Sequence, residues 1–64
     1  MKLKDARIRK GLTQLEVSQR LGVSLITVQR WEYYETKTKQ YQRMMLSVLY
    51  ELPIETIEWE SKNV

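Results

Sequence analysis

The chain has 64 residues, of which 42% are hydrophobic and 30% charged, with a net charge of +3. A chain of this length forms one small domain, expected over residues 1–64, and its core is too thin to hold a large internal active site. The sequence contains no Cys and no His, which excludes disulfides, the usual zinc sites and thiol or imidazole catalysis, so no enzyme, metal site or cofactor is expected.

Apolar residues recur at helical spacing along the chain, which predicts an all-α domain. The first helix is expected over residues 2–10, where Gly11 provides a left-handed end. Thr13 and Glu16 have the spacing of a capping box, so a second helix starts there and ends at Gly22 in the same way.

A third helix is expected over residues 25–33, with Ser24 as its N-cap. Two helices separated by a three-residue turn that contains Gly22 form a helix-turn-helix, a unit whose second helix can enter the major groove of DNA. The residues expected in the core are Leu3, Val17, Leu21, Val28 and Trp31.

Helical spacing resumes over residues 40–51, where Met44 and Met45 are interpreted as core. Pro53 suits the first turn of a short fifth helix, which Ile54, Glu55 and Ile57 also fit and which is expected to fray in the final residues ESKNV. The predicted architecture is therefore a compact domain of five helices.

Charge is distributed unevenly along the chain. Residues 1–43 hold ten basic and four acidic side chains, a net charge of +6, whereas residues 44–64 hold one basic and four acidic ones, a net charge of −3. The basic part favours a polyanionic partner.

The motifs that identify a family lie within residues 7–32, which read RIRKGLTQLEVSQRLGVSLITVQRWE. They are R-x-x-K-G-L-T-Q, the turn L-G-V-S and the helix end R-W-E. This stretch resembles the DNA-binding domains of the lambdoid phage repressor and Cro family, also called Xre-like, and a fainter resemblance continues over 46–57. The resemblance implies a lambda-repressor-like fold and a sequence-specific regulator of transcription that binds double-stranded DNA, as found in phages and mobile elements.

The third helix carries the residues expected to face the bases: Leu25, Ile26, Gln29 and Arg30. Arg30 can bind guanine with two hydrogen bonds, Gln29 can bind adenine, and the two aliphatic side chains can contact thymine methyl groups. Alternatively, Arg30 contacts only phosphate and Gln29 is only solvated. Because the family more often has polar residues at Leu25 and Ile26, a second hypothesis is a protein-interaction module, an antirepressor or adaptor that uses this face. A rotated helix that buries one of the two is also consistent with the pattern.

The resemblance places Gln14 on the DNA backbone, and the start of a helix suits a phosphate. The full set expected at the backbone is Gln14, Ser24, Thr27, Tyr33, Lys37 and Lys39. Arg7 and Glu32 are similar to a family pair that joins the first helix to the third, the alternative being a solvated Arg7. Tyr33 and Tyr34 stand where the family commonly has Asn-Gly, a helix stop, which favours a longer third helix here.

The C-terminal region, including Trp59, is expected either to pack on its own core or to form a homodimer. A two-fold dimer would set two third helices about 34 Å apart, which matches an inverted-repeat operator. The function that follows is a Cro-like or small repressor that occludes a promoter. Because the sequence has no 18-residue apolar run and no secretory signal, it is expected to be cytoplasmic, on the nucleoid when bound to DNA, with no membrane partner and no small-molecule ligand.

Overall fold

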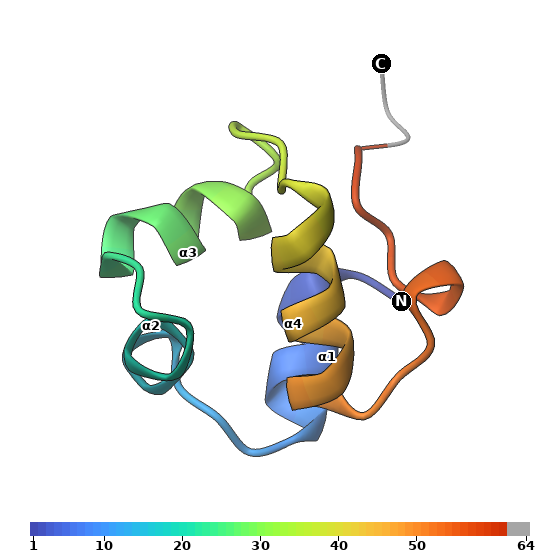
Figure 1. Ribbon diagram of the computed structural model, residues 1–64, viewed down its shortest axis with the longest axis horizontal. Coiled ribbons are helices and arrows are strands. Elements are labelled where there is room, and N and C mark those ends of the chain that lie inside the picture. Colours follow the sequence, from blue (N-terminus) through green and yellow to red (C-terminus); the bar gives the residue numbers. More distant parts are fainter. Residues whose placement is uncertain (62–64) are drawn as a thin grey trace.

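The computed structural model describes residues 1–61 as four α-helices and one 3-10 turn (Figure 1). The elements are α1 (Leu3–Arg9), α2 (Gln14–Leu21), α3 (Leu25–Glu32), α4 (Gln40–Tyr50) and the turn η1 (Ile54–Thr56). The helix-turn-helix is formed by α2 and α3, and both α3 and α4 pack on α1. The all-α prediction is confirmed, whereas the prediction of five helices is wrong by one.

The fifth helix is reduced to the single turn η1 because the two ends of the described chain pair with each other. Ile57 leaves helical geometry with φ −98° and ψ 134°, and its side chain is buried. Glu58 then donates its backbone N–H to the Met1 carbonyl over 2.7 Å and forms a bridge with Lys2. This pairing needs extended backbone, so it excludes a further helical turn at Ile57.

All four α-helices of the described chain end in a left-handed residue. These residues are Gly11, Gly22, Tyr34 and Glu51, with φ between 54° and 71°. In each case the amide of the next residue donates to the carbonyl five positions earlier, over 2.9–3.2 Å, which is the hydrogen bond of the Schellman motif. The two glycine ends are confirmed. The expectation of a longer third helix is wrong, because Tyr34 takes the place of the usual glycine.

Tyr34 holds this conformation through its side chain, since a left-handed residue with a Cβ costs roughly 1–2 kcal/mol. Its hydroxyl donates to the Glu58 carbonyl over 2.9 Å and accepts from the Leu3 amide over 3.4 Å. Partial burial raises the pKa of this phenol, so it remains a donor. Tyr34 therefore ties the loop after α3 to both chain ends and fixes where α3 stops.

The core lies between the helices, and each of the four α-helices contributes buried residues to it. Its buried members are Leu3, Ala6, Val17, Val28, Trp31, Leu46, Tyr50 and Ile57, each at most 4% exposed. Leu21 is only partly buried against this cluster. Met44 and Met45 are 54% and 41% exposed, so their interpretation as core is wrong. Leu46 and Tyr50, four residues apart, define the inward face of α4 and leave both methionines outside it.

The capping box at the start of α2 is confirmed in both directions. The Thr13 hydroxyl accepts from the Glu16 amide over 3.1 Å, and the Glu16 carboxylate accepts from the Thr13 amide over 3.0 Å. These hydrogen bonds lower the pKa of Glu16. The contribution of the carboxylate is therefore present above its unfolded-state pKa and is lost as the pH falls through the lower folded-state value.

Thr13→Ala should lower the Tm by about 5 °C, because it leaves an amide at the start of α2 without a side-chain acceptor. Thermal unfolding followed by circular dichroism measures the change. Thr36→Ala, at an exposed loop position, is the matched control and should leave the Tm unchanged. Equal Tm values for the two variants would contradict a stabilising role for the cap.

Candidate nucleic-acid interface

The exposed face of α3 is set by the side chains that α3 buries. Val28 and Trp31 are 1% and 2% exposed and anchor the helix on the core. Leu25 and Ile26, on the other side, are 39% and 53% exposed, so the structure does not support a rotation of α3 that buries one of them. Figure 1 shows α3 at the same end of the molecule as the start of α4.

Two polar side chains accompany these aliphatic ones. Arg30 is exposed, and its guanidinium has no hydrogen bond or ion pair with any residue in the described part of the chain. Gln29 is half-buried at the side of α3 that faces α2. The face therefore offers one unengaged guanidinium and one amide between exposed aliphatic groups, a combination able to contact base edges in the major groove.

Arg7 and Glu32 join α1 to the end of α3. Arg7 donates from Nε to one Glu32 carboxylate oxygen over 2.7 Å and from Nη2 to the other over 3.2 Å. The two side chains are 12% and 5% exposed. A third donor, Nη1, reaches the Leu12 carbonyl over 3.0 Å. The hydrogen bond with Glu32 raises the pKa of Arg7, so the pair is a partly buried, charge-assisted connection and Arg7 is not simply solvated.

Gln14 continues this network toward the exposed face of α3. Its amide nitrogen donates to Glu32 over 3.1 Å, and its amide oxygen accepts from Gln29 at 3.5 Å. The orientation of Gln29 thus depends, through Gln14, on the ion pair. Sequence reasoning missed this connection, because Gln14 and Gln29 belong to different helices and no spacing rule links residues 15 positions apart.

The side chains of Ser24 and Thr27 form a hydrogen bond with each other at the start of α3. The Ser24 hydroxyl lies 2.8 Å from the Thr27 hydroxyl and accepts a hydrogen bond from the Thr27 backbone amide over 3.3 Å. Ser24 is therefore the N-cap of α3 in the structure. A phosphate near this end would share hydroxyls that already stabilise the helix.

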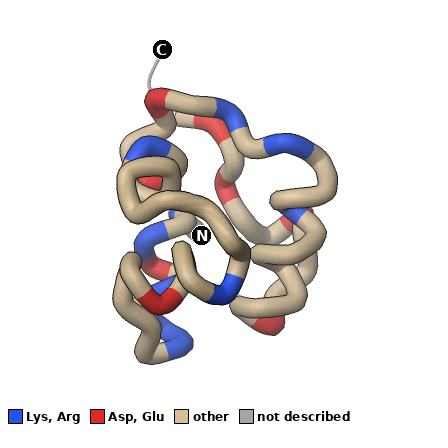
Figure 2. Tube along the Cα trace, turned by 60° about the vertical axis from the view of Figure 1, so that its left-hand side comes forward, with Lys and Arg blue, Asp and Glu red and all other residues tan. Residues whose placement is uncertain are grey.

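The remaining residues that are expected to contact the DNA backbone lie at and after the end of α3. Tyr33 is 74% exposed. Lys37 lies 3.7 Å from the Glu60 carboxylate, and both side chains are largely exposed. Lys39 is exposed, and its backbone amide caps α4 through Gln42 over 2.8 Å. Figure 2 shows basic and acidic positions close together near the C-terminal end of the described trace, so the acidic segment approaches the basic loop.

Trp59 packs on its own chain. Its indole N–H donates to the Ile54 carbonyl over 2.9 Å, and its ring is partly buried against the core. The Arg43 guanidinium lies 5.4 Å from the ring centroid. Of the two expectations for Trp59, the structure supports packing within the chain.

The model of the helix-turn-helix family matches residues 3–40, which is more than half of the chain and contains all of α1, α2 and α3. The chain belongs to the helix-turn-helix family. The match confirms the Xre-like resemblance and identifies a DNA-binding domain. No curated protein and no solved structure gives a significant match. The family model ends where α4 begins, so the exposed face of α4 is a feature of this helix-turn-helix protein outside the matched region.

Two further features of this helix-turn-helix protein concern residues 1–61 only. None of its described helices has the length and apolar character needed to cross a membrane. Within the same residues, no three acidic side chains gather into a group that would hold a metal ion.

Proposed function

We propose that the protein is a sequence-specific regulator of transcription that binds double-stranded DNA through α3 in the major groove and represses by occluding a promoter, as a small Cro-like protein. The observation that carries this proposal is the face of α3, where buried Val28 and Trp31 leave Arg30 without a partner in the described chain. A guanidinium free of internal contacts is available for the O6 and N7 atoms of guanine.

Gln29 is the second base-reading residue in this proposal. The contact with Gln14 holds its side chain at one edge of the face, and Glu32 in turn holds Gln14. An amide fixed in this way loses less side-chain entropy when it forms two hydrogen bonds with adenine. Leu25 and Ile26 supply apolar contacts for thymine methyl groups.

Phosphate contacts come from Gln14 at the start of α2 and from Tyr33, Lys37 and Lys39 after α3. Lys37 is available although it lies near Glu60, because an exposed ion pair contributes little and a phosphate can replace the carboxylate. Ser24 and Thr27, at the start of α3, are assigned to contacts with the DNA backbone. The action needs no cofactor or metal and places the protein in the cytoplasm, on the nucleoid when bound.

Selection of bound sites from random duplex DNA tests the proposal, and the expected result is an inverted repeat. The selected duplex should then lose affinity steeply with salt, with log K falling by about 0.9 per phosphate contact for each log unit of salt, for roughly four to six contacts per subunit. Absence of any enriched sequence, or an affinity that salt does not change, would count against DNA recognition by α3.

The exposure of Leu25 and Ile26 favours one alternative function, a protein-interaction module that uses the same face. The salt titration distinguishes the two functions, whereas Ile26→Asp tests only whether this face is used, because it should weaken binding to either partner. A protein interface formed by apolar contacts should be weakened by the substitution and depend little on salt, whereas DNA binding depends strongly on salt.

A further inference from the structure

Residues 58–60 are held on the fold by their own contacts, and we call them the acidic segment. The Glu58 carbonyl accepts a hydrogen bond from the Tyr34 hydroxyl over 2.9 Å, which joins the segment to the loop between α3 and α4. The Trp59 indole donates to a carbonyl of η1 over 2.9 Å, and the Arg43 guanidinium lies 5.4 Å from the centroid of its ring. The acidic segment is therefore fixed beside this loop.

This position brings a carboxylate to the loop that is proposed to bind DNA. The Glu60 carboxylate lies 3.7 Å from the Lys37 ammonium. Because Trp59 is fixed and directly precedes Glu60, the backbone keeps the carboxylate near Lys37. Side chains of the loop and of the segment together line a small hollow, namely Tyr34, Thr36, Lys37, Trp59, Glu60 and Ser61.

The ion pair between Lys37 and Glu60 is open to exchange. The two side chains are 81% and 63% exposed, so the pair contributes little to the stability of the fold. A DNA phosphate carries the same sign of charge as the carboxylate and can take its place on the ammonium group. The consequence of this pair is therefore expected in binding rather than in folding.

We propose that Glu60 is an internal competitor of DNA phosphate at Lys37 and lowers the affinity of the protein for duplexes of any sequence. The inference rests on the proposed function, in which Lys37 contacts the DNA backbone. The carboxylate has to leave Lys37 before a phosphate can bind there, and it then stays close to the polyanion. Because phosphate contacts carry no sequence information, Glu60 sets the overall affinity without changing which sequence is preferred.

A second ion pair of the same chemistry lies away from the proposed interface. Lys10, after α1, pairs with Glu51, after α4. Figure 1 places the ends of α1 and α4 at the opposite end of the molecule from α3. A duplex bound on α3 therefore meets Lys37 and not Lys10, so only the pair formed by Glu60 competes with DNA.

The affinity of Glu60→Gln for random duplex tests the competition. At about 50 mM salt the affinity should rise roughly two- to fivefold, the range expected when one exposed ion pair no longer has to be broken. The gain should be the same for the operator and should decline toward about 200 mM salt, because salt screens exposed charges.

Glu55→Gln is the matched control, because it removes the same charge from an exposed residue of η1 that has no ion pair within residues 1–61. Its affinity should change by less than about 1.5-fold, since a distant exposed charge is largely screened. Equal gains for the two variants would assign the effect to net charge and overturn the competition.

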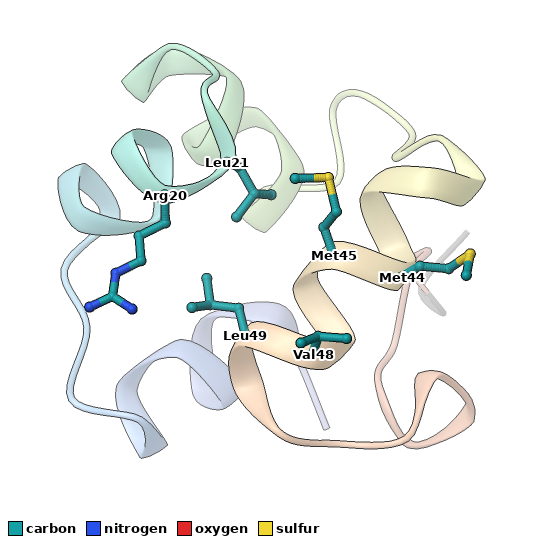
Figure 3. Close-up of a pocket in the computed structure, with 6 residues that line it drawn as sticks. All are labelled: Arg20, Leu21, Met44, Met45, Val48 and Leu49. Carbon is teal, nitrogen blue, oxygen red and sulfur yellow. The ribbon is translucent and has the colours of Figure 1, made fainter.

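Double variants test whether Glu60 acts through Lys37. In a Lys37→Ala background, Glu60→Gln should change the affinity no more than the control does, because the residue that both anions bind is missing. Arg20→Ala is the matched background with the same net charge. Figure 3 shows Arg20 on α2, at a groove between α2 and α4 that no residue of the acidic segment lines. Glu60→Gln should keep its full effect there, and equal gains in both backgrounds would reject competition at Lys37.

Carbodiimide cross-linking tests the contact itself. The reagent activates a carboxylate, the lysine Nζ attacks it to form an amide, and the carboxylate oxygen leaves in the urea formed from the reagent. In the protein without DNA, Lys37 should be joined to Glu60 and Lys10 to Glu51, as identified by mass spectrometry of peptides. Saturating duplex should reduce the first product at least severalfold and leave the second unchanged. If the first product does not form, or forms equally on DNA, the competition is rejected.

These outcomes separate the competition from the proposed function. If no variant binds duplex at about 50 mM salt, DNA recognition by α3 is rejected, and the competition falls with it. If all variants bind duplex and Glu60→Gln binds like the wild type, only the competition is rejected. Circular dichroism establishes that each variant is folded, and the Tm of Glu60→Gln should equal that of the wild type because its side chain is exposed.

Discussion

Glu32→Ala should lower the free energy of unfolding by about 3 kcal/mol, because it leaves a partly buried guanidinium without its counter-ion. Arg7 keeps only its hydrogen bond to the Leu12 carbonyl, and its side chain is 12% exposed. The same change removes the acceptor that holds the Gln14 amide. For a domain of this size the Tm should fall by more than about 10 °C, as measured by thermal unfolding.

Two variants separate this effect from a general loss of negative charge. Glu35→Ala removes an exposed carboxylate three residues further on and should leave the Tm within a few degrees of the wild type. Glu32→Gln keeps an acceptor for Arg7 and Gln14 without the charge, so its Tm should lie between those of Glu32→Ala and the wild type. If the Tm of Glu32→Ala equals the wild-type value, Arg7 is solvated and the ion pair with Glu32 does not stabilise the fold.

Local signals in the sequence were sufficient for the helices and for the side of α3 that is buried. Thr13 and Glu16 form their capping box within four residues, and Gly22 ends α2 through backbone conformation alone. The alternation of Val28 and Trp31 with exposed residues follows from helical periodicity. Such features depend on neighbours in the chain, which a single sequence displays.

The features that the sequence did not predict depend on contacts between distant residues. Tyr34 ends α3 in a conformation typical of glycine because its hydroxyl reaches Glu58. The pairing of Glu58 with the first residues removes the expected fifth helix. Met44 and Met45 have apolar side chains of the kind found in a core, and only the packing of α4 shows that they are exposed.

The candidate interface divides in the same way. The family motif was sufficient to pair Arg7 with Glu32, which the structure brings within 2.7 Å. The link between Gln14 and Gln29 appears only when α2 and α3 are placed together. The chain of contacts from the partly buried ion pair to the half-buried Gln29 amide therefore comes from the three-dimensional arrangement, and it relates the stability of the fold to the orientation of a residue that we propose contacts bases.

Arg30→Ala should reduce affinity for the selected operator by about 10- to 100-fold and relax the preference at one base pair, because a bidentate contact to guanine contributes roughly 1–3 kcal/mol of discrimination. The substitution should leave the fold intact, since the Arg30 side chain has no internal hydrogen bond or ion pair in the described chain. Binding to the operator and to duplexes changed at single positions, measured at one salt concentration, gives both quantities.

Lys37→Ala is the matched control for this measurement. Lys37 is also an exposed, positively charged residue near the end of α3, but it is assigned to a phosphate contact. Its removal should weaken binding to the operator and to random duplex by the same factor and lower the salt slope by about one contact. Arg30→Ala should instead reduce operator binding far more than random binding. If both variants lose affinity equally on the two duplexes, Arg30 contacts only phosphate, and sequence preference then has to come from Gln29 and the two aliphatic residues of α3.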